Sequence, residues 1–141
     1  MVRLSALLVV IPTLLASTFA TPVPVSTNGT EFELLEKRVT HTGRGTFYYT
    51  GLGACGWTNH DSEAVIAISS SIFGKGGNCG QYVQITNTKN KKTTFAKTVD
   101  SCPGCGSGDL DMSPSTFQKL GTLDQGVLSI SWHFQAKGWK P

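Results

Sequence analysis

The chain has 141 residues, of which 39% are hydrophobic and 15% are charged, and its formal net charge is +3. This small basic excess does not indicate a nucleic-acid-binding protein, although it could favour anionic surfaces such as acidic polysaccharide. After residue 20 no stretch is both long and apolar enough to cross a membrane.

Residues 1–20 have the pattern of a secretory signal peptide. Arg3 precedes a short apolar run that ends in the small residues from Ala16 to Ala20, which is the order of an export signal and its cleavage site. Pro12 interrupts the run, which is too short for a membrane anchor. We therefore expect cleavage near Ala20 and a secreted, extracellular protein.

Residues 21–38 differ in composition from the rest and predict a pro-segment. They end in Lys37-Arg38, a dibasic pair of the kind that processing proteases cut in the secretory pathway. Asn28 begins the chain's one glycosylation sequon, which would leave with the segment. The alternative is that residues 21–38 are not removed and stay attached as an N-terminal tail. Removal would leave residues 39–141, a single domain of about a hundred residues with one modest core.

All four cysteines, Cys55, Cys79, Cys102 and Cys105, lie after the predicted pro-segment. An even number in a small exported domain indicates two disulfides. The Cys102-x-x-Cys105 spacing is also that of a redox site or half a zinc knuckle. No βαβ pattern surrounds it and the other two cysteines are isolated, so we expect structural disulfides and neither metal nor cofactor. Spacing alone leaves three pairings open.

The secondary-structure signal is mostly of period two. Residues 45–50 and 64–68 are short strand candidates, and residues 81–86 and 93–99 flank a lysine-rich turn as a hairpin. Residues 127–134 alternate, and their apolar face consists of Leu128, Ile130, Trp132 and Phe134.

One helix is well signalled. Ser113 can cap it, Pro114 suits its first position and Gly121 ends it.

Tyr48 and Tyr49 should point to opposite faces of the first strand, one into the core and one towards a binding surface. Short strands, glycine-rich turns and a short helix together favour a small all-β barrel.

Asp100 and Asp111 border the same Gly/Cys/Pro loop. Two such carboxylates could hold sugar hydroxyls or act as acid and base. A carboxylate just before a helix can instead stabilise the helix N-terminus, so a structural role stays open for Asp111. Trp57 lies in a polar loop and could stack on a sugar ring or fold over the barrel end. Trp139 is expected to be a tail residue and not a ligand platform.

Five segments resemble, in order, the double-psi β-barrel of expansins, barwin and rare-lipoprotein-A-like proteins. Residues 45–49 resemble its opening strand, and the other matching segments are residues 53–56, 78–85, 98–102 and 108–121. The resemblance implies a six-stranded double-psi barrel with one or two short helices, closest to secreted single-domain fungal members. It also implies the disulfides Cys55–Cys79 and Cys102–Cys105.

Carried over residue by residue, Thr46, Asp100 and Asp111 match the polysaccharide groove of expansins. Asp111 also matches the general acid of related glycoside hydrolases. Those enzymes carry a second carboxylate on the opening strand, where this chain has no Asp or Glu. Cys102 replaces an expected groove aromatic, and Ser69 stands near the histidine of lytic transglycosylases. The resemblance therefore supports hydrolysis and peptidoglycan cleavage poorly.

The resemblance implies a non-hydrolytic, expansin-like monomer that binds or modifies cell-wall polysaccharide such as cellulose or chitin. The expected groove residues are Thr46, Tyr48, Trp57, Asp100 and Asp111. A protein-binding module, such as a defence-related effector or an inhibitor of secreted cysteine proteases, is the alternative, because related small barrels inhibit papain-like proteases. An enzyme of unknown chemistry is a third possibility, but no cofactor motif supports it.

Overall fold

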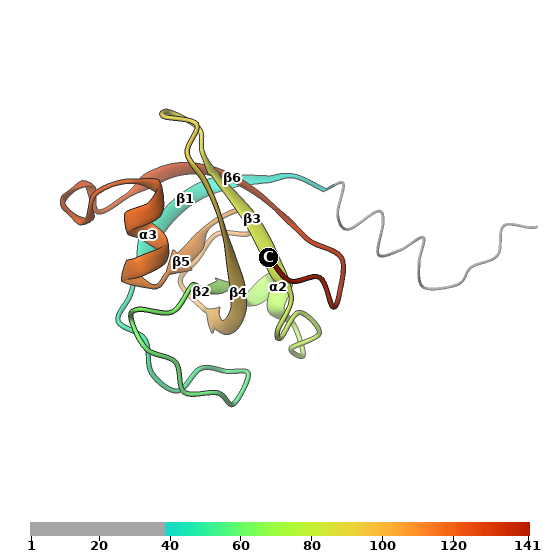
Figure 1. Ribbon diagram of the computed structural model, residues 1–141. Helices are drawn as coiled ribbons and strands as arrows, with labels where there is room; N and C mark the ends of the chain where they lie inside the picture. The colour runs from blue at the N-terminus through green and yellow to red at the C-terminus, as the bar shows by residue number, and fades with distance from the viewer. Residues whose placement is uncertain (1–38) are drawn as a thin grey trace, which may run out of the picture.

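The computed structural model describes residues 39–141. The predicted signal peptide and pro-segment, with Asn28, Lys37 and Arg38, lie outside the described residues. The six strands are β1 (His41–Phe47), β2 (Val65–Ser69), β3 (Tyr82–Asn87), β4 (Thr93–Cys102), β5 (Leu110–Met112) and β6 (Leu128–Phe134). They close into a barrel of order β1-β5-β2-β4-β3-β6 (Figure 1). The β1–β5 and β2–β4 pairs are parallel, and the other four pairs are antiparallel.

The predicted helix is present as α3 (Pro114–Leu120). The Ser113 hydroxyl accepts a hydrogen bond from the Thr116 amide, which satisfies one of the free N–H groups of the first turn. Phe117 and Leu120 are fully buried, so α3 closes one flank of the core beside β1, β4 and β5. Two shorter helices, α2 (Ser70–Phe73) and η1 (Leu123–Gln125), complete the described part.

The core fills the barrel interior with the inward faces of alternating strands. The predicted inward residues of β6 are each at most 4% exposed. β3 alternates in the same way, with Val83 and Ile85 fully buried. All five residues of β2 are buried, and the strand pairs with β4 along one edge and with β5 along the other.

The first strand differs from its predicted bounds of 45–50. It begins at His41, because residues 41–45 pair with β6, and it ends at Phe47. Its glycines hide this start, since glycine is rare in strands. Gly43 and Gly108 permit a close approach of the two backbones: a Cβ on Gly43 would lie 2.4 Å from the carbonyl oxygen of Gly108, and a Cβ on Gly108 would lie 1.9 Å from the carbonyl oxygen of Thr42.

The early end of β1 corrects the expectation that Tyr48 or Tyr49 is a core residue. Tyr48 is half-buried and Tyr49 is 75% exposed, because strict alternation stops where the strand stops. Phe47 takes the inward place and packs against the core.

The described cysteines form the disulfides Cys55–Cys79 and Cys102–Cys105, the two pairs that the resemblance implied. The first joins the long loop after β1 to the turn before β3. The second closes the turn that follows β4. Their loops differ in length, with sequence separations of 24 and 3 residues.

The two disulfides should contribute unequally to the free energy of unfolding. Cross-linking restricts the unfolded chain more when the closed loop is longer, so Cys55→Ser/Cys79→Ser should cost about 3.5 kcal/mol and Cys102→Ser/Cys105→Ser about 2 kcal/mol. Denaturant unfolding of the two double mutants measures this difference. Equal losses, or a larger loss at the short loop, would contradict the entropic account.

Candidate functional site

Thr46 and Asp111 face each other across the parallel β1–β5 pair. They are register partners, and the Thr46 hydroxyl donates a 2.8 Å hydrogen bond to Asp111 Oδ1. Burial and, to a smaller extent, the negative charge of Asp100 raise the pKa of Asp111, while the Thr46 hydrogen bond opposes that rise. A half-buried carboxylate therefore stands in the barrel wall at a site where ionisation is unfavourable.

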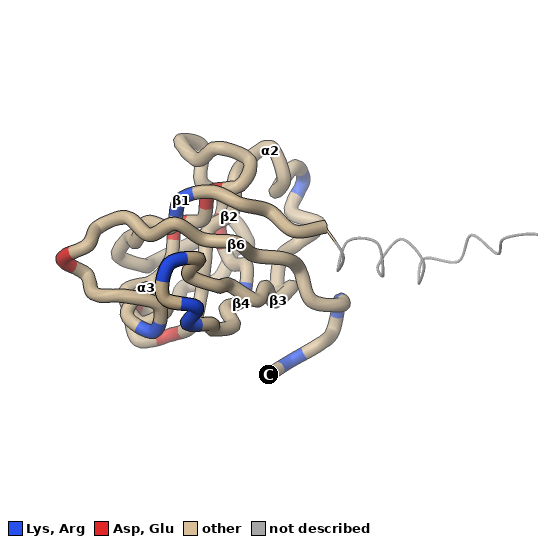
Figure 2. The backbone as a smooth tube through the Cα atoms, turned by 90° about the horizontal axis from the view of Figure 1, so that it is seen from above, with Lys and Arg blue, Asp and Glu red and all other residues tan. Residues whose placement is uncertain are grey.

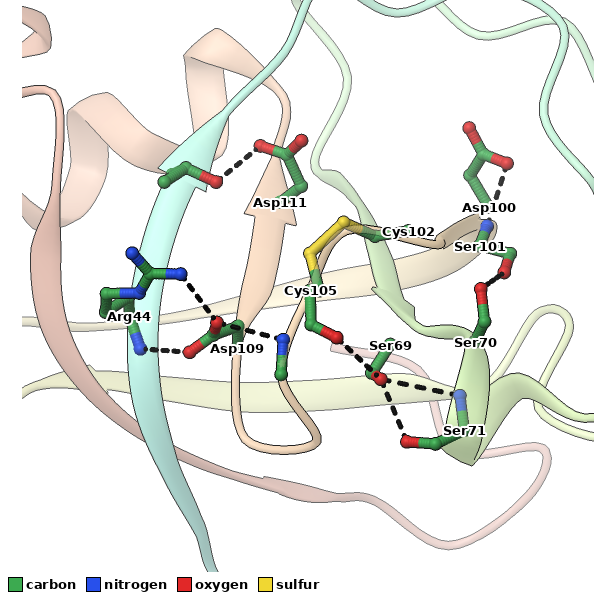
Figure 3. Close-up of a disulfide and its surroundings, with 12 residues drawn as sticks. Arg44, Ser69, Ser70, Ser71, Asp100, Ser101, Cys102, Cys105, Asp109 and Asp111 are labelled. Atoms are coloured by element: carbon green, nitrogen blue, oxygen red, sulfur yellow. Dashed lines mark hydrogen bonds and ion pairs between the residues drawn. A yellow bond between two sulfur atoms is a disulfide. The ribbon is translucent and has the colours of Figure 1, made fainter.

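Asp100 stands on the other side of β2 from Asp111. Ala67 of β2 pairs with Asp100 on β4 and with Asp111 on β5. The two aspartate backbones are therefore two strand spacings apart, about 9–10 Å. Both carboxylates point to the same side of the sheet (Figure 3).

A bulge in the β2–β4 register turns Asp100 outward. The register shifts between Ile66 and Ala67, and opposite this shift both Thr98 and Val99 are buried. Strict alternation after the outward Lys97 would place Val99 outside and Asp100 inside. The extra residue reverses that order, as β-bulges commonly do near functional sites.

Asp100 also anchors the long loop after β1. Its Oδ1 accepts 2.8 Å hydrogen bonds from the amides of Ala54 and Ser101. One oxygen of this carboxylate is thus committed to positioning the loop that carries Cys55.

Tyr48 stands beside both aspartates. Its amide donates to the carbonyl of Met112, which extends the β1–β5 contact by one residue. Burial, followed by the negative charges of Asp100, Asp111 and Asp61, raises the pKa of Tyr48 far above its usual range. The phenol therefore stays protonated and can donate a hydrogen bond at physiological pH.

A cavity of about 260 Å³ opens beside Thr46 and Asp111. Its other walls come from Arg44 and Asp109 and from the Cys102–Cys105 turn. Asp109 accepts hydrogen bonds from the amides of Arg44 and Gly106 and forms a 3.2 Å salt bridge with Arg44 Nη2 (Figure 3). These contacts lower the pKa of Asp109, and the hydrogen bond from the Arg44 amide has the largest effect.

The sequence analysis did not identify Arg44 and Asp109. Each lies two residues before a predicted groove residue, Thr46 and Asp111 respectively. Period two places such residues on the same face of an extended chain, so that signal was available.

Two positions where related enzymes carry other residues have structural roles here. Ser69 is 2% exposed; its hydroxyl accepts from the Ser71 amide at the start of α2 and donates to the Cys105 carbonyl. Cys102 is part of the disulfide in the cavity wall. β1 places no carboxylate opposite Asp111.

Trp57 lies apart from the Thr46–Asp111 cavity. Its ring contacts the turn at Gly80 on one side, and Lys97 Nζ lies 5.4 Å from the ring centroid. The structure therefore brings together Thr46, Tyr48, Asp100 and Asp111, and it places Trp57 on a neighbouring surface.

Among residues 39–141, no helix could span a membrane and no three His, Cys, Asp or Glu side chains gather as a metal site.

Several known proteins are similar to this chain. An "Allergen Asp f 7 homolog" of Arthroderma benhamiae is 42% identical over 113 residues, 66% of this chain and 38% of the relative. Expansin-like protein 5 of Dictyostelium discoideum is 33% identical over 65% of this chain and 43% of its own length. The papain inhibitor of Streptomyces mobaraensis is 31% identical over 66% of this chain and 70% of its own length.

The chain belongs to the double-psi β-barrel superfamily of expansins, barwin and rare-lipoprotein-A-like proteins.

Solved structures agree with this membership. A Clavibacter michiganensis expansin mutant in complex with cellohexaose is 27% identical with a TM-score of 0.64, covering 73% of this chain and 54% of the expansin. The Streptomyces papain inhibitor is 32% identical with a TM-score of 0.60, covering 68% of this chain and 94% of the inhibitor. No protein-family model matches the chain. The chain thus spans about two fifths of the first two relatives, a little over half of the expansin and nearly all of the solved inhibitor.

The two carboxylates on either side of Leu110 should respond oppositely to pH. A raised pKa means that ionised Asp111 destabilises the fold, so Asp111→Asn should unfold at higher denaturant than the parent near neutral pH. A lowered pKa means that ionised Asp109 stabilises it, so Asp109→Asn should lose about 1–2 kcal/mol, mostly from hydrogen bonds because Arg44 is exposed.

The difference in unfolding free energy between each mutant and the parent should shrink as the carboxylates of the parent become protonated. The Asp109 contribution is lost as pH falls through its lowered pKa, and the Asp111 penalty disappears below its ordinary pKa. Denaturant unfolding of both mutants from neutral pH to about pH 3 measures the two trends. If both mutations changed the free energy of unfolding in the same direction at neutral pH, the opposite pKa shifts assigned to Asp109 and Asp111 would be contradicted.

Proposed function

We propose that the chain is a secreted, expansin-like protein that binds cell-wall polysaccharide, such as cellulose or chitin, without hydrolysing it. The observation that carries this proposal is the Thr46–Asp111 pair, hydrogen-bonded in the wall of an open cavity. The cellohexaose complex of the related expansin supports a glycan ligand. Export rests on the predicted signal peptide and on the extracellular character of the relatives' roles.

The chemistry of the groove suits sugar hydroxyls, which both donate and accept hydrogen bonds. Asp111 supplies an acceptor, and Tyr48 supplies a phenol that stays protonated. Arg44 adds a donor at the rim of the cavity. Hydrogen bonds to a charged partner contribute about 1.5–3 kcal/mol each, so a few of them hold an oligosaccharide at modest affinity.

The absence of hydrolysis is part of the proposal. Glycosidic cleavage by acid and base requires a second, correctly spaced carboxylate. β1 supplies none, and Asp100 already accepts two amide hydrogen bonds through one oxygen. Asp100 then acts chiefly as the anchor of the groove loop.

Asp111→Ala should reduce retention on insoluble cellulose or chitin by about tenfold or more, the effect of losing one hydrogen bond to a charged partner. Depletion assays on both polysaccharides measure this. Asp124→Ala is the matched control, because it removes the same charge from the exposed η1 turn. Parent protein that is retained no better than an unrelated control, or equal retention of both mutants, would refute the proposal.

Inhibition of a papain-like protease is the second candidate function. The chain covers nearly all of the solved papain inhibitor. It also exposes apolar side chains on the loop after β1, since Tyr49 and Leu52 are 75% and 76% exposed. Large exposed apolar residues are typical of protein-binding surfaces.

If this loop inhibits papain, the double mutant Tyr49→Ala/Leu52→Ala should weaken inhibition by about tenfold or more, as loss of an interface anchor does. Val127→Ala, which truncates a half-exposed apolar residue elsewhere, is the control. Asp111→Ala should inhibit normally. Steady-state inhibition of papain provides the measurement, and a parent protein without micromolar inhibition would exclude this function.

A further inference from the structure

A second cavity, of about 390 Å³, lies outside the groove. Four parts of the fold build its walls: the residues that lead into β2, the outer face of the β3–β4 hairpin, α3 and the C-terminal residue Pro141. The side chains that matter for its chemistry are Glu63, Tyr82, Phe95, Lys97 and Lys119.

This cavity is separate from the Thr46–Asp111 groove. The two share no lining residue. Lys97 precedes Asp100 by three residues on β4, which is roughly 10 Å of strand. The bulge at Val99 lies between them.

Aromatic residues neighbour Lys97 on the outer face of the hairpin. Tyr82 is its register partner across the hairpin, and Phe95 is the next outward residue on β4. Trp139 packs against both rings, with centroids 6.0 Å from Tyr82 and 4.8 Å from Phe95, and so fixes them in place. The ring centroid of Trp57 lies 5.4 Å from Lys97 Nζ, although Trp57 itself does not line the cavity. Such rings bind the apolar faces of sugars and can also stabilise a nearby cation.

Two of the side chains that line this cavity are basic, Lys97 and Lys119, and one is acidic, Glu63. Among the described residues, Lys97 and Lys119 form no salt bridge, and their ammonium groups donate no hydrogen bond to a side chain. The opposing carboxylate, Glu63, already accepts hydrogen bonds from the His60 amide and Asn59 Nδ2. Figure 2 shows further basic residues on the β3–β4 turn and the C-terminal tail, none of which lines this cavity.

We propose that this cavity is a second binding site, which takes the uronate residues of an acidic polysaccharide. Lys97 and Lys119 bind the sugar carboxylate, and the rings of Tyr82, Phe95 and Trp57 border the pyranose. Aromatic rings without lysines would also accept a neutral sugar, and lysines without aromatic rings would accept any polyanion. Their combination selects a ring that carries a carboxylate. The site does not depend on the groove or on its proposed ligand.

Titration with tetragalacturonate, followed by amide chemical shifts and by calorimetry, tests this site. The signals of residues 82, 95 and 97 should move, and those of residues 46 and 111 should not. Affinity should fall as salt rises from about 0.01 M to about 0.15 M, over which the Debye length shortens from roughly 30 Å to roughly 8 Å. Cellotetraose, a neutral chain of similar length, and oligoglutamate, an anion without sugar rings, should both leave these signals in place.

The double mutant Lys97→Gln/Lys119→Gln should bind tetragalacturonate about tenfold more weakly, because it removes both solvent-screened charge contacts to the sugar carboxylate. Lys91→Gln/Lys92→Gln removes the same charge from the exposed turn and should change affinity less than about twofold. Trp57→Ala should also weaken binding, and Asp111→Ala should not. Thermal unfolding confirms that each variant is folded.

The outcomes separate this site from the groove. Equal losses in the two lysine pairs, or equal binding of oligoglutamate, would show simple attraction to net charge and overturn the proposal. Shifts confined to residues 46 and 111 would place the uronate in the groove and overturn it too. Loss of cellulose retention in Asp111→Ala, with tetragalacturonate binding intact, would support both sites as independent.

Discussion

The double pairing of β2 is the constraint on which the groove depends. At Ala67 this strand bonds to β4 on one side and to β5 on the other, so a single residue fixes the spacing of Asp100 and Asp111. β2 is buried along its whole length, and a close-packed strand cannot slide without disturbing every neighbour. A register slip of β4 or of β5 by one residue would also turn the aspartate of that strand to the other face. The distance between the two carboxylates is therefore a property of the barrel and not of a flexible loop.

The groove reduces the stability of the fold and its surroundings offset that loss. Asp111 is held where ionisation is unfavourable, and the hydroxyl of Thr98, next to the bulge, is buried without a hydrogen-bond partner among the described residues. Such groups destabilise a protein unless the surrounding structure holds them in place. Asp109 and its amide partners tie the loop before β5 to β1, and the indole of Trp132 donates a 2.8 Å hydrogen bond to the carbonyl of Gly108 in the same loop. These contacts keep β5, only three residues long, against β1.

The parts of the fold that the sequence predicts well are those with local causes. The β3–β4 hairpin, β6 and α3 follow from alternation, a turn and a cap, all within a few neighbouring residues. α2 gives no such signal, because it has four residues and none of them is buried. The early start of β1 depends on pairing with β6, nearly ninety residues away, and on the close contact at Gly108. Long-range pairing of this kind leaves no periodic trace in the strand itself.

The same distinction applies to the sites. The resemblance supplied Thr46, Asp100 and Asp111 as separate positions, and only the barrel brings them together with Tyr48. Arg44 and Asp109 could have been predicted from the sequence, because each lies two residues before one of those positions and side chains alternate along a strand. The cavity at Lys97 was not, because Lys119 reaches it from α3 and Glu63 from a loop. Neither residue lies in a recognisable motif with Lys97.

The bulge at Val99 explains how one strand can serve two surfaces. Before it, the outward residues of β4 are Phe95 and Lys97, at the aromatic cavity; after it, the outward residue is Asp100, at the groove. An unbroken strand would present one of these sets and bury the other, since side chains alternate with a strict period of two. The bulge also increases the local twist, so the two outward sets face different directions. Asp100 at the groove and Lys97 at the aromatic cavity are therefore presented by the same strand on separate surfaces.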